Sequence, residues 1–135
     1  SLLNSESGLL GLAGSSDFRD VLSAAEAGSK EASLALGVWA WRIRHYIGAY
    51  AALLGGLDAL VFTGGIGENS ADARVRCVEG LEFLGVEIDN HLNRRDASLS
   101  RIISPSGSSV AVMVIPTNEE LEIALQTADV VRRAR

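Results

Sequence analysis

The sequence has 135 residues, a length that supports one domain built around one core. Apolar residues make up 47% of it and charged residues 21%, which is typical of a folded globular protein and argues against a disordered chain. The formal net charge of −5 argues against a nucleic-acid-binding surface, which would need clustered positive charge.

The single cysteine, Cys77, excludes an intrachain disulfide and favours a reducing compartment. It falls inside a predicted amphipathic helix without a basic partner, so we expect it to be structural. Residues 1–6 lack the basic region of a secretory signal, and Arg42 and Arg44 interrupt the longest apolar stretch. We therefore expect a cytoplasmic protein that binds neither nucleic acid nor membrane.

The first half of the chain predicts a loop followed by two helices. Residues 5–16 are rich in glycine and serine and are typical of a loop or short turns, and a brief helix is expected over 18–27. Ser29 is placed to cap a second helix, in which apolar residues recur at spacings of three and four over 30–54. Gly55 and the glycine after it should end this helix.

The second half predicts four strands or strand-like segments and two more helices. In chain order, the expected elements are a strand at 58–62, a glycine-rich turn at 63–70, a helix at 71–83 capped by Asn69 or Ser70, a short edge strand at 86–88, a helical turn at 90–96, a strand at 101–103, a turn at 105–108, a strand at 110–115 and a closing helix at 118–133.

The strands at 58–62 and 110–115 are almost entirely apolar, as expected for strands covered on both faces. Strands of this kind joined through helices predict an α/β fold with a mostly parallel sheet. We expect these two strands to be neighbours, with the helices at 30–54 and 119–133 packed on the sheet. Ligands of such sheets bind beyond the carboxyl ends of the strands, which directs attention to loops 63–70 and 116–120.

The loop at 63–70 carries Gly64, Gly65 and Gly67, which allow positive φ angles and a close approach of a ligand to the backbone. Nucleotide binding is favoured over a tight connection without a ligand. A second possibility is a dinucleotide (NAD) fingerprint, with Glu87 at the distance expected for a ribose-binding acid. That possibility ranks lower because Ser70 replaces the third glycine.

The loop at 116–120 contains a possible capping box, in which Thr117 and Glu120 each bond the backbone of the other. Glu119 is then left without a structural task. At a strand's carboxyl end it is placed to hold Mg²⁺ directly or through water. From spacing alone, a solvated glutamate in the first turn of a helix is the favoured interpretation.

The segment at 15–20 also has two interpretations. In the first, Ser16 or Asp17 caps the short helix and Arg19 pairs locally. In the second, Arg19 stacks on or pairs with a ligand while Phe18 packs beneath it. The residues alone favour the local interpretation.

Three motifs together resemble the acetate kinase family. They are SGLLGLAGSSDFRD at 7–20, VFTGGIGENS at 61–70 and IPTNEEL at 115–121, with a further similarity in YIGAY at 46–50. Their order and spacing agree with the family across essentially the whole chain. Several multi-residue matches in order are far more specific than one glycine-rich loop.

The resemblance implies an actin-like ATPase (ribonuclease H-like) fold and an ATP:acetate phosphotransferase that forms acetyl phosphate and ADP. It implies that residues 1–135 are the C-terminal, nucleotide-binding part of a longer kinase. The residues that it places at the ATP or ADP site are Asp17, Phe18, Arg19, Gly65, Ile66, Gly67, Glu68 and Asn69, and it assigns Glu119 to Mg²⁺.

The match covers about the last third of a full-length family member. The catalytic and acyl-binding groups are therefore expected in the missing N-terminal part, and no catalytic residue is assigned in this chain, which we expect to be inactive alone. The resemblance implies a homodimer formed through the helix that contains residues 39–54. Acetate and propionate stay open as substrates, and a nucleotide-binding module without chemistry is the alternative function.

Overall fold

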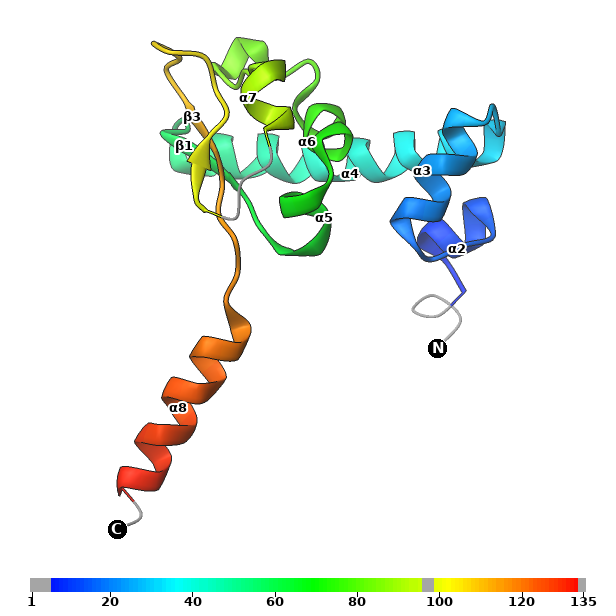
Figure 1. Cartoon of the computed structure of the whole chain (residues 1–135). Coiled ribbons are helices and arrows are strands. Elements are labelled where there is room, and N and C mark those ends of the chain that lie inside the picture. Colours follow the sequence, from blue (N-terminus) through cyan, green and yellow to red (C-terminus); the bar gives the residue numbers. More distant parts are fainter. Residues whose placement is uncertain (1–5, 96–98, 134–135) are drawn as a thin grey trace.

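A computed structural model describes residues 6–95 and 99–133 of the chain (Figure 1). Its elements, in chain order, are α2 (Gly8–Ala13), α3 (Phe18–Glu26), α4 (Lys30–Leu54), β1 (Ala59–Phe62), α5 (Gly64–Asn69), α6 (Ala71–Val78), a 3₁₀ turn (Glu82–Leu84), α7 (Asn90–Arg94), β2 (Arg101–Ile102), β3 (Ala111–Val114) and α8 (Glu119–Arg133). Residue 5 of the predicted loop at 5–16 and residue 96 of the predicted helical turn at 90–96 lie outside the described residues.

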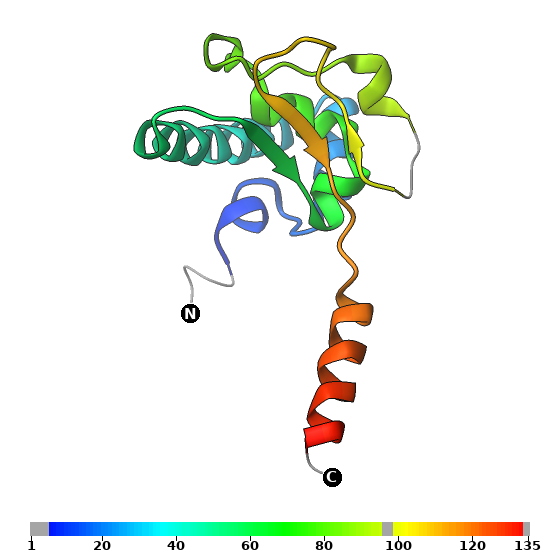
Figure 2. The same cartoon turned by 90° about the vertical axis from the view of Figure 1, so that its left-hand side faces the viewer.

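The three strands form one mixed sheet in the order β1-β3-β2. β1 runs parallel to β3, with Ala59 opposite Ala111 and Phe62 opposite Val114, and β2 runs antiparallel to β3. The expectation that the two apolar strands are neighbours is therefore confirmed. Their carboxyl ends lie side by side, which brings the loops that follow them to the same edge of the sheet (Figure 2).

The long helix α4 lies behind the sheet and carries the two hydrophobic clusters of the core (Figure 2). Near its carboxyl end, Ile47 packs with the central strand and with α6; near its amino end, Leu36 packs with α3. Trp39 contacts both clusters, so the two parts of the core are continuous along one helix.

The ends of α4 follow the sequence prediction closely. The Ser29 hydroxyl accepts a hydrogen bond from the Ala32 N–H at 3.2 Å, which satisfies one of the unpaired donors of the first turn. At the other end Gly55 adopts a left-handed conformation with φ of 76°, and its N–H donates to the Ala51 carbonyl. Both caps are local features, which is why they can be read from sequence.

Two segments predicted as loop or turn are helical. Residues 8–13 form α2 because Leu9 and Ala13 have an apolar surface on α4 to pack against, which a reading of local composition cannot include. The glycine-rich turn folds into the single-turn helix α5. The next helix, α6, is capped by Ser70 as predicted but ends at Val78, because Gly80 has a φ of 80° and the chain continues as a 3₁₀ turn.

The predicted edge strand at 86–88 is wrong. Val86 is fully buried against the sheet, which explains its apolar pattern, but the segment forms no ladder with a strand. Its backbone bonds are local or isolated: the Val86 N–H donates to the Leu81 carbonyl at 3.4 Å, and the Asp89 N–H just beyond it donates to the Ile103 carbonyl at 2.8 Å. A buried segment without strand pairing has the same apolar pattern in the sequence as a strand, so the two cannot be told apart at that level.

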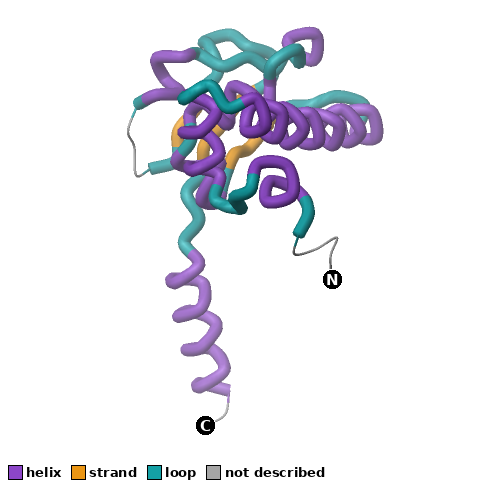
Figure 3. Tube along the Cα trace, turned by 90° about the vertical axis from the view of Figure 1, so that its right-hand side faces the viewer, coloured by secondary structure: helices purple, strands orange, loops and turns teal. Residues whose placement is uncertain are grey.

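The expectation that the closing helix packs on the sheet is also wrong. α8 extends away from the rest of the chain, and none of its residues is buried (Figures 1 and 3). Its exposed large apolar side chains are Leu121, Ile123, Leu125, Val130 and Val131. The predicted capping box is absent as well, since Asn118 Oδ1 accepts from the Leu121 N–H at 3.1 Å.

The helices of the described residues include none with the length and apolar character of a membrane span.

The packing of α3 on α4 gives a direct test of this fold. Leu36 is completely buried, whereas Leu34 on the same helix is 60% exposed. We expect Leu36→Ala to lower the free energy of unfolding by about 2–5 kcal/mol through lost burial and a residual cavity. Leu34→Ala, the matched control, should change it by less than about 0.5 kcal/mol. Urea denaturation followed by circular dichroism measures both, and equal effects of the two variants would contradict this packing.

Candidate functional site

Two segments far apart in the sequence line one cleft of about 510 Å³, here called the α3–α5 cleft. It brings together six of the residues that the sequence analysis assigns to the nucleotide: Asp17, Phe18, Arg19, Gly65, Ile66 and Asn69. Gly67 and Glu68, the other two, do not line it. The cleft therefore joins the Arg-bearing turn to the exposed side of the glycine-rich helix.

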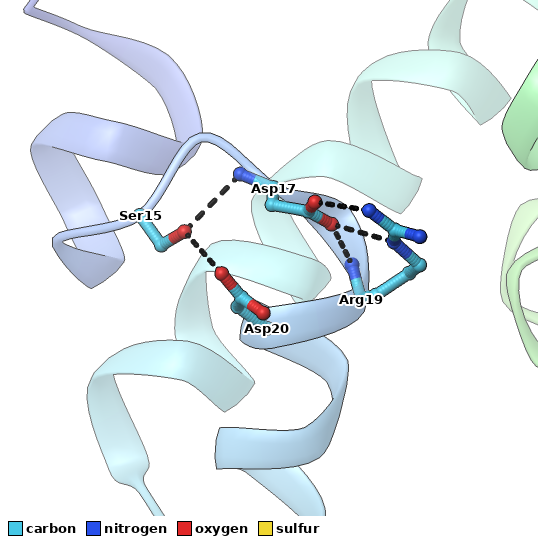
Figure 4. Close-up of polar contacts among 4 residues, drawn as sticks. All are labelled: Ser15, Asp17, Arg19 and Asp20. Atoms are coloured by element: carbon cyan, nitrogen blue, oxygen red, sulfur yellow. Dashed lines mark hydrogen bonds and ion pairs between the residues drawn. The ribbon is translucent and has the colours of Figure 1, made fainter.

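Asp17 and Arg19 form a compact unit at one side of this cleft (Figure 4). The Asp17 carboxylate accepts from the Arg19 backbone N–H at 2.8 Å, from Nε at 3.1 Å and from Nη2 at 2.7 Å. These bonds from Arg19, the side-chain bond first, lower the pKa of Asp17 to about 2. The predicted local pairing is thus present, and the lowered pKa keeps Asp17 ionised at neutral pH, while the third guanidinium nitrogen points away from Asp17 (Figure 4).

Phe18 lies between these two charged residues and points into the core. It is 5% exposed, and its ring centroid lies 4.7 Å from that of Trp39 in a tilted arrangement. Aromatic pairs of this geometry are favourable beyond the area they bury. Phe18 therefore anchors the turn on α4 and so fixes the position of the neighbouring guanidinium.

The three glycines of α5 differ in why, or whether, the fold requires a residue without a side chain. Gly64 has a φ of 71°, a left-handed conformation that other residues adopt at a cost. A Cβ atom on Gly67 would lie 3.3 Å from the Phe62 carbonyl carbon, so a side chain there would press on the end of β1. Gly65 has neither restriction: a Cβ atom would meet nothing within 4 Å, and the residue lines the α3–α5 cleft.

Glu68 turns its carboxylate toward the end of β3. One oxygen, Oε1, accepts from the Gly64 N–H at 2.7 Å and from both the N–H and the hydroxyl of Thr117 at 2.9 Å. These bonds, with the Thr117 N–H first, lower the pKa of Glu68. Glu68 instead lines a neighbouring hollow of about 440 Å³ that also contains Arg74 and Pro116.

Asn69 ends the glycine-rich helix and stays at the cleft. Its side-chain amide donates to the Gly65 carbonyl at 2.9 Å, a bond within one helical turn. The following residue, Ser70, accepts from the Ala73 N–H and so begins α6. The polypeptide therefore turns from α5 into α6 directly beneath the α3–α5 cleft.

Glu119 is the first residue of α8 and is exposed. In the part of the chain that the structure describes, no three His, Cys, Asp or Glu side chains gather closely enough to hold a metal ion. A carboxylate oxygen is nevertheless a ligand that Mg²⁺ prefers, and Mg²⁺ is commonly held by one or two carboxylates with water and phosphate oxygens. Glu119 fits that pattern as a single ligand from this chain.

The profile of the Acetokinase family matches residues 1–125 of the sequence. The chain belongs to the acetokinase family. Among curated relatives it is similar to the acetate kinases of Clavibacter sepedonicus, with 59% identity over 126 residues, and Leifsonia xyli subsp. xyli, with 55% identity over 130 residues. These alignments cover 93% and 96% of the chain but 32% and 33% of the relatives. The chain thus spans about a third of the length of the curated relatives it matches.

Solved structures of the family share this fold. The acetate kinase of Porphyromonas gingivalis superposes with a TM-score of 0.86 at 42% identity, over 96% of this chain and 33% of that one. A propionate kinase from Francisella tularensis subsp. tularensis SCHU S4 gives a TM-score of 0.81, also at 42% identity, over 90% and 31%. The α/β, actin-like ATPase fold that the resemblance implied is therefore confirmed for this acetokinase segment.

Arg74, a buried residue that holds the acetokinase motif in place, is not among the site residues predicted from the sequence. Its side chain is 2% exposed. It donates to the Gly67 and Glu68 carbonyls at 2.7 and 2.9 Å, and to Oδ1 and the carbonyl of Asn93 at 2.7 Å each. Spacing held a usable signal, because Arg74 occupies an apolar-face position relative to Cys77, Val78 and Leu81.

Removing this guanidinium should destabilise the segment strongly. Arg74→Met would leave its four carbonyl and amide acceptors without their charged donor, and we expect a loss of about 3–5 kcal/mol in the free energy of unfolding. Arg76→Met on the same helix is the control and should cost less than about 1 kcal/mol, because Arg76 is only partly buried. Urea denaturation of both variants decides this; similar midpoints would show that the buried bonds contribute little.

Proposed function

We propose that this chain is the nucleotide-binding C-terminal part of an ATP:acetate phosphotransferase that forms acetyl phosphate and ADP. The observation that carries the proposal is the α3–α5 cleft, which unites two motifs of the family that lie far apart in the sequence. The names of the relatives support phosphoryl transfer to a small carboxylate. Because the chain spans a third of those relatives, the complete reaction is assigned to the full-length enzyme.

The cleft offers complementary groups for the adenosine side of ATP or ADP. Arg19 presents a planar cation whose side chain is 88% exposed, and Asp17 holds it in one orientation. Guanidinium groups stack on aromatic rings, which suits an adenine base. Gly65 leaves room for a close approach to the backbone, while Ile66 supplies apolar surface and Asn69 a polar group. Phe18 lines the cleft and also fixes the turn through its contact with Trp39, and Gly67 lets the helix pack closely on the end of β1.

The metal side of the nucleotide is assigned to Glu119. It follows the carboxyl end of β3, the strand that lies next to β1 and its glycine-rich helix. Mg²⁺ would bind through this carboxylate or through a water that it orients, with phosphate oxygens completing the shell. Neutralising phosphate charge is a large part of phosphoryl-transfer catalysis, so this single residue would matter to turnover.

The remaining machinery is assigned to an N-terminal part of the same enzyme. Phosphoryl transfer requires several groups to position both substrates at once, and no catalytic residue is assigned here. The exposed apolar side chains of α8 suit burial against that part. The acetate kinase of Porphyromonas gingivalis and the propionate kinase of Francisella tularensis are each 42% identical to this segment, so acyl specificity is assigned elsewhere.

We further propose that the enzyme is a cytoplasmic homodimer joined through α4. One side of this helix exposes a run of aromatic residues, in which Trp41, His45, Tyr46 and Tyr50 contact one another with ring centroids 5.6 to 6.3 Å apart. Arg42 lies over the Tyr46 ring at 4.8 Å. Exposed aromatic surface of this kind is enriched at protein interfaces.

Two alternative functions are an NAD-binding domain and a nucleotide-binding module without catalysis. For NAD, Glu87 would have to reach the glycine-rich helix, but it lines a separate hollow with Val75 and Val86. A non-catalytic nucleotide-binding module would use the same cleft, so it predicts the same ligand without turnover. A full-length enzyme that binds ATP but makes no acetyl phosphate would favour that module.

Gly65→Ala tests the cleft without disturbing the fold. Alanine fits the helix and meets no neighbour, so stability should stay the same or rise slightly. Its methyl group would nevertheless occupy the cleft, and we expect ADP to bind at least roughly tenfold more weakly, the equivalent of one lost close contact. Isothermal titration with ADP, ATP and NAD measures this.

The matched control is Gly37→Ala in α4, a helical glycine that also has open space for a Cβ atom but lies outside the cleft. It should leave ADP affinity unchanged. If Gly65→Ala binds ADP as tightly as Gly37→Ala does, or if the protein prefers NAD, the proposed nucleotide site is refuted.

Glu119→Gln tests the metal assignment in the full-length enzyme. Losing the negative charge should raise the Mg²⁺ concentration for half-maximal activity by roughly tenfold or more. Glu120→Gln, the next residue in the same first turn, should leave it unchanged. Acetyl phosphate formation over a Mg²⁺ series measures both, and an equal response of the two variants would make Glu119 an ordinary solvated helix residue.

A further inference from the structure

Glu68 lies within the family motif, but its contacts are unlike those of the other motif residues. Gly65, Ile66 and Asn69 line the α3–α5 cleft, whereas Glu68 lines the neighbouring hollow. Its Oε1 already accepts three hydrogen bonds from protein groups, two of them from Thr117. A carboxylate oxygen engaged in this way is poorly placed to contact an anionic nucleotide.

Two of the three bonds join segments that are 49 residues apart, and the third lies within α5. On one side, the carboxylate holds the Gly64 N–H at the start of α5. On the other, it holds Thr117, which lies between the end of β3 and the start of α8. The backbone of Glu68 is fixed independently, because its carbonyl accepts from Arg74 at 2.9 Å. The backbone of Glu68 is thus held by Arg74, and the Glu68 side chain in turn holds Thr117.

Glu119 is two residues beyond Thr117, and Asn118 between them caps α8. A displacement of Thr117 would therefore move the whole first turn of α8 relative to α5. None of the α8 side chains is buried in this segment, so the start of α8 is constrained by the Glu68–Thr117 bonds together with the Ile115 N–H bond to the Phe62 carbonyl.

We infer that Glu68 is a positioning residue that sets the distance between the nucleotide cleft and Glu119, and that it does not bind the nucleotide itself. This inference rests on the proposed function for its consequence on Mg²⁺, but the bridge between Glu68 and Thr117 stands on the contacts alone. Charge-assisted bonds of this type persist while the carboxylate is ionised, and the lowered pKa of Glu68 keeps it ionised at neutral pH.

The bridge is tested first without any ligand, on the chain itself. In Glu68→Ala the Thr117 and Gly64 amides lose their acceptor, and their hydrogen exchange should become roughly tenfold faster or more. Glu82→Ala is the matched control, because among the described residues its carboxylate accepts from the nearby Gly80 N–H, at 3.2 Å, and from no distant segment. Unchanged Thr117 exchange in Glu68→Ala would show that the bridge does not exist in solution.

The consequence is tested in the full-length enzyme with a double-mutant cycle. Glu68→Ala should raise the Mg²⁺ requirement roughly tenfold, in the range for residues that orient a metal ligand, while Mg²⁺-free ADP affinity changes less than about twofold. Combined with Glu119→Gln it should add little, because Glu68 acts through Glu119. Glu68→Gln keeps a carbonyl acceptor and should restore most of the wild-type Mg²⁺ response.

Three results would overturn the inference. Loss of Mg²⁺-free ADP binding in Glu68→Ala, as large as in Gly65→Ala, would make Glu68 a nucleotide ligand. Multiplying effects of Glu68→Ala and Glu119→Gln would make the two residues independent. Should Glu68→Ala fail to fold, Thr117→Val takes its place, because it removes one of the three bonds and should raise the Mg²⁺ requirement more weakly. An unchanged Mg²⁺ requirement in Thr117→Val would be the third such result. Absence of any ADP binding by the wild-type enzyme would instead refute the proposed function and leave the exchange result standing.

Discussion

The buried guanidinium of Arg74 is the interaction on which the rest of the site depends. A charge removed from water must have its donors satisfied, and here the acceptors are backbone carbonyls of α5 together with Asn93 of α7. Three short elements that could not be stable separately are thereby held together. The position of Glu68, and through it of Thr117, follows from this one side chain.

The two walls of the cleft are attached to different hydrophobic clusters. Its first wall, the turn at Asp17–Arg19, is anchored through Phe18 to the cluster at the amino end of α4. Its second wall, α5, is attached to the sheet, whose core is the other cluster. Trp39 packs against both clusters, so the two walls are connected through side chains along a single helix.

Sequence reasoning reached the features that depend on neighbouring residues or on simple patterns. The Ser29 cap, the two parallel strands and the placement of the glycine-rich loop at a strand's carboxyl end are of this kind. It failed where a distant partner decides the outcome. α2 is helical because α4 offers it a surface, and Thr117 donates its N–H and hydroxyl to Glu68, 49 residues away, while Asn118 takes over the capping of α8. A charged residue such as Arg74 on an apolar face is a signal that can be searched for in sequence.

The lone cysteine has a practical consequence for following motion in this segment. Cys77 is 2% exposed on α6, and burial raises the pKa of its thiol to about 12, so almost no thiolate is present at neutral pH. Alkylating reagents can therefore react only when α6 separates from the sheet. The rate of Cys77 alkylation would thus report how often α6, the helix that holds Arg74, opens. No added label is needed, because these 135 residues contain no other thiol.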